Sequence, residues 1–151
     1  MLIKTHLVFA VLAYLFLFEY IDNKVVFLLA LLVATVFVDI DSRNSRIGKH
    51  WYLRPLQWIV KHRGIFHTLL FAFGLSFLIY FFSHSAGLGF LLGYVLHLLL
   101  DCFTVSGVRL FSPFSRIKIG FFIKTGGLIE QILFVLALLF DVFIIWKSVF
   151  N

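Results

Sequence analysis

The stretch "AGLGFLLGYVLHLLLDCF", residues 86–103, is apolar except for His97 and Asp101. Its length is close to the roughly 20 residues that cross a bilayer as a helix, so it predicts a transmembrane helix. His97 and Asp101 are four residues apart, which places them on one helical face where both can reach one cation. Glycines at 87, 89 and 93, and Gly74 upstream, favour close approach of neighbouring helices.

Four more apolar runs flank this stretch, at about residues 5–20, 24–39, 66–83 and 128–147. With 62% hydrophobic residues and a mean hydropathy of +1.07, the chain falls outside the range of soluble domains. We therefore expect an all-α integral membrane bundle of about five transmembrane helices, forming a single membrane-embedded domain over residues 1–151. In the segment 40–65, "IGKHWYLRPLQWIVKHRG" mixes aromatic and basic residues and predicts an interfacial helix between the second and third spans.

The basic residues fall almost entirely on one side of the membrane in this five-span arrangement. Only Lys24 and Lys147 fall on the other side. By the positive-inside rule, the basic side is cytoplasmic, so we expect a multi-pass protein of the cell membrane with a cytoplasmic N-terminus and an extracytoplasmic C-terminus. The net charge of +6 is explained by orientation, and we expect the lipid bilayer as partner and no nucleic acid. The single cysteine, Cys102, excludes an internal disulfide and a multi-cysteine zinc site.

Eight ionisable residues at the ends of these spans all fall on the basic side. They are His6, Asp39, Asp41, His62, His67, His97, Asp101 and Glu130. Ionisable groups at a membrane are costly, so their convergence predicts a functional site. In "HRGIFHT", residues 62–68, Gly64 allows the chain to turn so that His62 and His67 can approach each other. Imidazole and carboxylate ligands suit a divalent zinc ion, or manganese or iron, with room for one or more ions.

Simpler interpretations exist for several of these residues. His97 and Asp101 could hydrogen-bond to each other and bind no metal. Glu130 lies in the first turn of the fifth span, where an acid stabilises a helix N-terminus. Arg63 and Arg109 obey the positive-inside rule whether or not either binds a phosphate.

Three motifs carry a family resemblance. "DIDS" at 39–42, "HRGIFHT" at 62–68 and "HLLLDCFTVSGVRLFSP" at 97–113 resemble the YdjM-type family of LexA-regulated, membrane-bound, predicted metal-dependent hydrolases. The family patterns are Asp-x-Asp, His-Arg-Gly-x-Thr-His-Ser and His-x-x-x-Asp-x-x-Thr-x-x-Gly. In this chain Phe66 replaces the Thr and Thr68 replaces the Ser.

The resemblance implies a cytoplasm-facing hydrolase similar to zinc-dependent phospholipases. It nominates as metal ligands Asp39, Asp41, His62, His67, His97 and Asp101, with Arg63, Thr104 and Gly107 as supporting motif residues. Gly64 is a further supporting residue because of the turn that it allows. His6 is not part of these motifs, and we add it to the candidate ligands because of its residue type and its expected depth in the membrane.

The residues predict a hydrolase that acts on a phospholipid or another amphiphilic ester through a metal-activated water. In this hypothesis Asp41 or Glu130 is the general base, and Arg63 or Arg109 binds the substrate phosphate. An ion or metal transporter would need polar groups that continue across the bilayer, whereas the eight residues are one-sided. A scaffold with a structural metal is a third hypothesis, which predicts metal binding without turnover.

Overall fold

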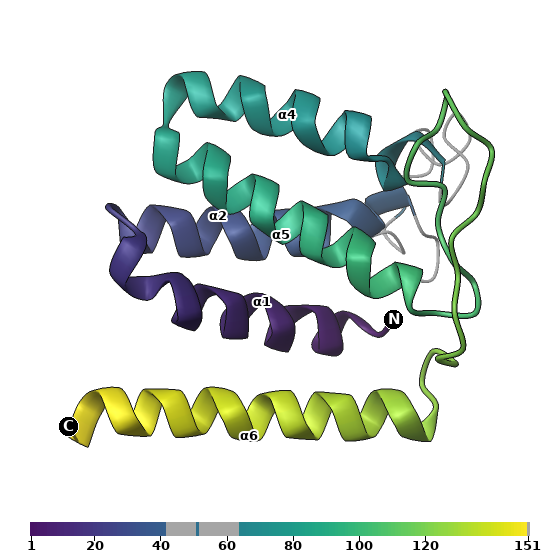
Figure 1. Cartoon of the computed structure of the whole chain (residues 1–151). Helices are drawn as coiled ribbons and strands as arrows, with labels where there is room; N and C mark the ends of the chain where they lie inside the picture. The colour runs from purple at the N-terminus through teal and green to yellow at the C-terminus, as the bar shows by residue number, and fades with distance from the viewer. Residues whose placement is uncertain (42–50, 52–63, 151) are drawn as a thin grey trace.

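The computed structural model describes residues 1–41, 51 and 64–150, and there the chain is all-α (Figure 1). The five α-helices of this part are α1 (Ile3–Leu17), α2 (Lys24–Phe37), α4 (Leu69–Phe82), α5 (His84–Cys102) and α6 (Leu128–Phe150). Short 3-10 turns lie at η1 (Phe18–Tyr20), η2 (Val38–Asp41) and η4 (Ile65–His67). The predicted interfacial helix lies outside the described residues except for Trp51.

Polar side chains define where the apolar helices begin. Asn23, Thr68 and Ser83 each accept a hydrogen bond from a backbone N–H in the first turn of α2, α4 and α5. Such a cap satisfies an amide that the helix itself leaves without a partner. Because Ser83 alone separates α4 from α5, the two helices form a tight antiparallel pair.

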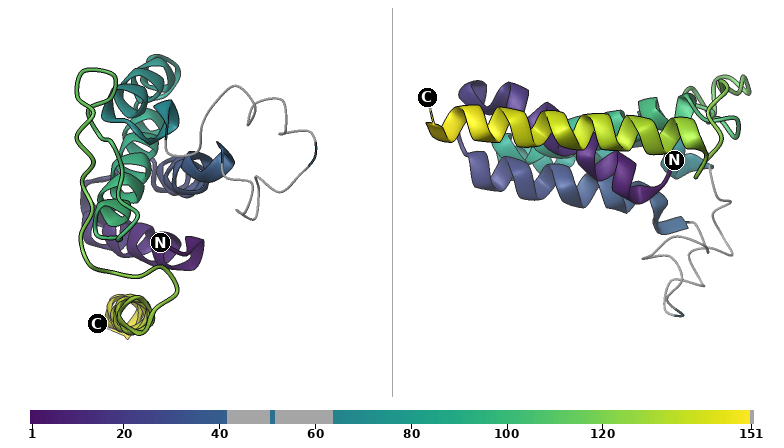
Figure 2. Two further views of the ribbon diagram at one scale, coloured as in Figure 1. Left: turned by 90° about the vertical axis from the view of Figure 1, so that its right-hand side faces the viewer. Right: turned by 90° about the horizontal axis from the view of Figure 1, so that it is seen from below.

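Helix α5 is the centre of the bundle. It packs against α2 and α4, while α1 lies beside α2 and carries α6 on its outer side (Figures 1 and 2). A Cβ on Gly89 would lie 2.4 Å from the carbonyl oxygen of Phe27, and one on Gly93 would lie 2.3 Å from that of Leu31. Glycine is therefore required for the close contact between α5 and α2. A Cβ on Gly87 would lie 2.6 Å from the Cα of Tyr80 in α4, so this glycine allows close contact between α5 and α4. The expectation for Gly74 is wrong, because nothing lies within 4 Å of the position its Cβ would take.

Three segments of the described chain are long and apolar enough to cross a membrane: Ile3–Tyr20, His84–Cys102 and Leu128–Phe150. Helices α2 and α4 have 14 residues each. At 1.5 Å per residue such a helix measures about 21 Å, against a hydrocarbon core of about 30 Å. The predicted spans 24–39 and 66–83 thus contain shorter helices than expected. The turn η2 replaces the last turn of the first span, and η4 replaces the first turn of the second.

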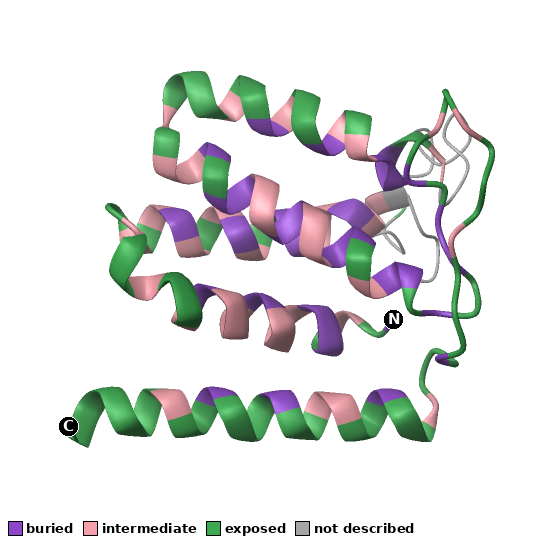
Figure 3. Cartoon of the chain, viewed as in Figure 1, coloured by how far each residue is buried: buried purple, intermediate pink, exposed green. Residues whose placement is uncertain are grey.

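The outer faces of the helices are apolar and exposed (Figure 3). Helix α6 shows this most clearly, since only Glu130, Ala137 and Asp141 of its 23 residues are buried. Large exposed hydrophobic side chains on helices of this length indicate a lipid environment.

The segment 103–127 joins α5 to α6 and lies across one end of the bundle, beside the N-terminus (Figures 1 and 2). Two isolated bridges, Thr104 with Ile123 and Val108 with Ile119, hold its two arms together. We call this end of the molecule the loop end. The turns η2 and η4, the last turn of α5 and the first turn of α6 lie there as well.

Candidate metal centre

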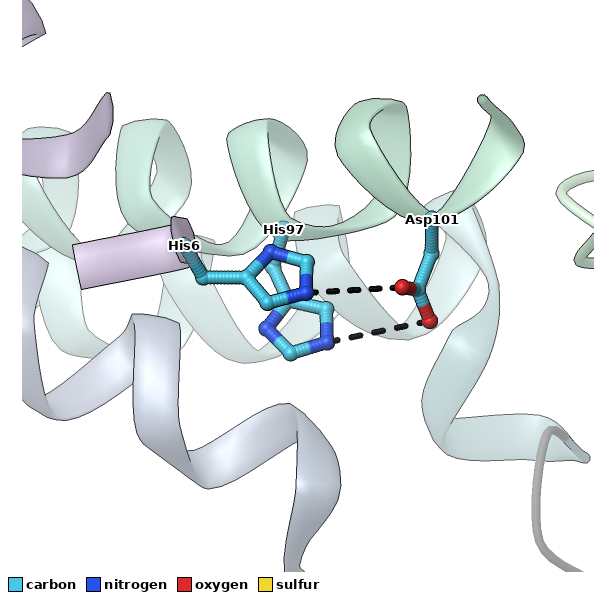
Figure 4. Close-up of side chains that lie close together, drawn as sticks. All are labelled: His6, His97 and Asp101. Carbon is cyan, nitrogen blue, oxygen red and sulfur yellow. Dashed lines mark ion pairs between the residues drawn. The ribbon is translucent and has the colours of Figure 1, made fainter. Parts of the chain in front are cut away.

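Two overlapping groups of metal-binding side chains lie at the loop end. One consists of His6, His97 and Asp101, and the other of Asp39, His67 and His97. Within each group the ligand atoms lie within 4.8 Å of one another, and His97 belongs to both. Residues of all three sequence motifs thus contribute to these two groups, together with His6 from α1. Figure 4 shows the group of His6, His97 and Asp101.

The separations of the ligand atoms suit coordination. His6 Nε2 lies 3.4 Å from Asp101 Oδ1, and His97 Nε2 lies 3.7 Å from Asp39 Oδ1 and 4.0 Å from Asp101 Oδ2. Ligands that surround a zinc ion tetrahedrally at about 2.0–2.1 Å are about 3.3 Å apart. The observed distances are slightly larger, so a small inward movement would bring the ligands onto one ion. The 4.0 Å between His97 and Asp101 does not support the alternative of a direct hydrogen bond.

The backbone of α2 determines which nitrogen of His97 is available. His97 Nδ1 lies 2.7 Å from the carbonyl oxygen of Thr35, which belongs to the last turn of α2. A carbonyl can only accept a hydrogen bond, so Nδ1 must carry the proton. In the neutral ring the lone pair is then on Nε2, which faces the two carboxylates, and a hydrogen bond to the other nitrogen is the usual support of a metal-bound histidine.

His6 comes to the site from α1 and stacks on His97. The two ring centroids are 3.9 Å apart and the ring planes differ by 3°. Neither nitrogen of His6, nor Nε2 of His97, has a hydrogen-bond partner among the described residues, although both rings are almost fully buried. Leaving such a group unsatisfied costs about 1–3 kcal/mol each. A metal ion would bind the one lone pair of each neutral ring.

Asp39 and His67 come from the 3-10 turns and not from the helices. His67 Nε2 lies 3.7 Å from Asp39 Oδ1 and 3.9 Å from Asp101 Oδ2. Burial alone would raise the pKa of the Asp39 carboxyl, but the nearby rings of His67 and His97 hold this pKa below its ordinary value. The ionised carboxylate is the form that binds a cation.

Several contacts that position the site carry no clear signal in the sequence. The Tyr94 hydroxyl donates a hydrogen bond to the carbonyl of Phe66 and so holds η4, which contains His67, against α5. The carbonyl of Thr35 and the amino group of Met1, which contacts Asp101 Oδ1 at 2.5 Å, are backbone atoms. Residue type does not reveal such contacts.

The supporting motif residues shape the end of α5. Thr104 is fully buried, and its hydroxyl donates to the carbonyl oxygen of Asp101 at 2.7 Å. Gly107 has a φ of +52°, and a Cβ there would lie 2.4 Å from the carbonyl oxygen of Ile119. These two residues turn the chain away from the helix just after the ligand Asp101. Gly64 has a negative φ of −86°, and its carbonyl accepts the N–H of His67 to close the η4 turn.

Glu130 is not in either ligand group. Its Oε1 accepts from the backbone N–H of Leu2 at 2.6 Å and from the Thr5 hydroxyl at 2.8 Å, and its Oε2 accepts from the N–H of Gly126 at 2.6 Å. These contacts join the start of α1 to the start of α6. They favour the capping interpretation of this residue.

The remaining predicted site residues are not part of the two ligand groups. Arg109 is exposed on the segment 103–127. His62, Arg63 and the side chain of Asp41 lie outside the described part of the chain. The two departures from the family pattern have local explanations: Phe66 is buried against Phe71, and the Thr68 hydroxyl caps α4 and donates to the carbonyl of Ile65.

Comparison with known proteins places the chain, with its buried histidine and aspartate residues, in a family. The model of the YdjM inner membrane protein family matches residues 1–150 of the chain. The chain belongs to this family. It is accordingly an inner membrane protein, which agrees with its three candidate spans and confirms the resemblance that the three motifs predicted.

Relatives of this YdjM-family chain are distant. The uncharacterized protein YvsG of Bacillus subtilis (strain 168) is 30% identical over 105 residues, which is 66% of each chain. The inner membrane proteins YdjM of Escherichia coli (strain K12) and Shigella flexneri are 36% identical over 84 residues, or 50% of this chain and 43% of theirs. The chain thus spans less than two thirds of the length of these relatives. No solved structure matches it.

Proposed function

We propose that this YdjM-family protein is a membrane-bound, metal-dependent hydrolase that acts at the headgroup level on a phospholipid or another amphiphilic ester. The observation that carries the proposal is the orientation of His97. Its Nδ1 is tied to the Thr35 carbonyl, and its Nε2 faces Asp39 and Asp101 with no hydrogen-bond partner among the described residues.

In this proposal five buried or half-buried side chains hold the metal. They are His6, Asp39, His67, His97 and Asp101. Asp101 Oδ1 faces His6 and the Met1 amino group, and Oδ2 faces His67 and His97. An ion bound by Oδ1 would have to replace the amino group there, and the carboxylate could then serve one ion or bridge two. Imidazole and carboxylate donors favour zinc, with manganese or iron as alternatives. A divalent ion bound there would lower the pKa of a water ligand towards neutrality and polarise an ester oxygen.

Other residues of the chain would handle the proton and the substrate. Because both oxygens of Glu130 already accept hydrogen bonds, we assign the general base to Asp41, which follows Asp39 in the same turn. Arg109, exposed at the loop end, would pair with a phosphate of the substrate, and Arg63 is the second candidate for this role. His62 would complete the ligand set.

The distribution of charge supports a cytoplasmic position for the loop end. Among the described basic residues, Lys4, Arg109, Arg116, Lys118 and Lys124 belong to the loop end or its adjoining segment, whereas Lys24 and Lys147 belong to the opposite end. We propose that the five helices cross the membrane with the N-terminus inside, α2 and α4 being accommodated by local thinning.

The one-sided placement of the centre favours an enzyme over a transporter. Away from the loop end, the buried polar side chains of the described residues are Ser76 in α4 and Asp141 in α6. These two residues lie on helices that are separated by α5 and α1 (Figure 2). They do not continue the centre into a polar path across the bundle.

Metal analysis of protein purified without chelator tests the proposal. We expect wild type to retain a divalent metal, His97→Ala to lose most of it, and His84→Ala to retain it. His84 is the matched control because it is exposed at the opposite end of the same helix, where it contacts Tyr80. A screen of phospholipid and phosphodiester substrates then follows with the same three proteins. Wild type that retains no metal would overturn the proposal.

A further inference from the structure

The segment 111–122, "FSPFSRIKIGFF", combines exposed aromatic and basic side chains at the loop end. Phe114 is 85% exposed, Ile117 71% and Phe122 70%. Arg116 and Lys118, on either side of Ile117, are exposed as well. We call the exposed side chains of residues 109–124 the loop surface.

The loop surface has one sign of charge. Residues 103–127 contain Arg109, Arg116, Lys118 and Lys124 but no Asp or Glu. None of these four basic side chains forms an ion pair within the part of the chain that the structure describes. Their charge is therefore available to an anionic partner.

The opposite face of the same segment is fixed to the bundle. Val108, Leu110 and Ile123 are buried, and the carbonyl of Leu110 accepts the N–H of Leu69 at the start of α4. The segment also begins and ends at two candidate spans, α5 and α6. In the proposed arrangement both of its ends lie at the membrane surface, and the contacts with the bundle keep the segment close to that surface.

We propose that the loop surface binds the headgroups of anionic phospholipids of the membrane that α5 and α6 span. Aromatic side chains at the headgroup level remove apolar area from water, and the basic side chains between them pair with phosphate. The positive-inside rule accounts for the sign of the charge but not for the interleaved, exposed phenylalanines. This binding does not depend on hydrolysis, although a headgroup held here lies at the same end as the metal centre.

Lipid selectivity of the purified full chain tests this proposal. Protein in detergent micelles is supplied with equal amounts of phosphatidylglycerol and phosphatidylcholine, and the retained lipids are counted by native mass spectrometry. The loop variant is Arg116→Gln with Lys118→Gln. The control is Lys24→Gln with Lys147→Gln, which removes the same charge from the opposite end. A basic residue near an anionic surface changes partitioning about fivefold, so we expect the loop variant to lose most of the phosphatidylglycerol preference and the control to keep it.

Added salt provides a second measurement on wild type alone, because raising the salt concentration should reduce the preference by screening. No preference in wild type, or an equal loss in both variants, would overturn the proposal. Metal content is measured in the same samples. A chain without metal that still selects phosphatidylglycerol would reject the hydrolase and keep the lipid site.

Discussion

Two roles are conceivable for Glu130: that of a general base and that of a residue joining α1 to α6. By its type and depth it is a candidate general base, yet its carboxylate accepts three hydrogen bonds from Leu2, Thr5 and Gly126. Two of these donors are backbone amides: that of Gly126 is local, whereas that of Leu2 is brought to Glu130 only by the fold. A carboxylate engaged on both oxygens is better suited to hold two segments together than to take a proton from water.

Glu130→Gln is therefore expected to reduce stability and not metal binding. The amide NH₂ can no longer accept, so at least one of the three donors loses its bond to the carboxylate, and a hydrogen bond to a charged group contributes about 1.5–3 kcal/mol. Thermal unfolding in detergent and metal analysis of the same preparation measure the two effects. If the variant unfolds like wild type but has lost its metal or its activity, Glu130 belongs to the active centre instead.

At the scale of elements, the contact between α2 and α5 determines the geometry of His97. Gly89 and Gly93 let the two backbones approach closely enough for the Thr35 carbonyl to reach His97 Nδ1. His97 lies one turn after Gly93 on the same helix. The packing of two apolar helices thus controls a polar site.

Gly93→Ala is expected to disturb this contact. The added Cβ would lie 2.3 Å from the Leu31 carbonyl and 3.0 Å from the Thr35 hydroxyl, so α5 must move away from α2. Overpacking of this kind costs about 1–3 kcal/mol. We expect a lower melting temperature together with a lower metal content.

Gly74→Ala is the matched control, since nothing lies within 4 Å of the position its Cβ would take. It should leave both quantities unchanged. Similar losses in the two variants would show that the α2–α5 contact does not control the centre.

At the scale of the whole molecule, the centre connects segments that are distant in the sequence. Its ligands come from α1, η2, η4 and α5. A bound metal would add to the stability of the fold, by about 2.7 kcal/mol when the metal is present at a hundredfold excess over its dissociation constant.

Removal of metal with a chelator is expected to lower the melting temperature of wild type and of His84→Ala but not of His97→Ala. Hydrogen exchange should quicken at the first turn of α1, η2 and η4, while the turn at Ser83 stays protected. This contrast is expected because Ser83 lies at the end of the bundle away from the ligands. A uniform change along the chain would argue against a metal at the loop end.

The sequence by itself determined the membrane class, the all-α fold, the family motifs and the gathering of His6, Asp39, His67, His97 and Asp101 at one end. Hydropathy runs and helical spacing are local properties, and an alternating course through the bilayer follows from them. The five α-helices of the described residues lie where five spans were predicted, but only three of these segments are long and apolar enough to cross a membrane, and η2 and η4 shorten two of the helices.

Only the tertiary structure decided that His97 is shared by two ligand groups, that its Nε2 is the available nitrogen, and that Glu130 joins α1 to α6. The last two of these outcomes depend on backbone groups: the carbonyl of Thr35 in α2 for His97, and the amides of Leu2 and Gly126 for Glu130. Backbone groups are the same in every residue, so no pattern of residue types reveals them. Their positions follow from how closely the helices pack, and the glycines of α5 set that distance.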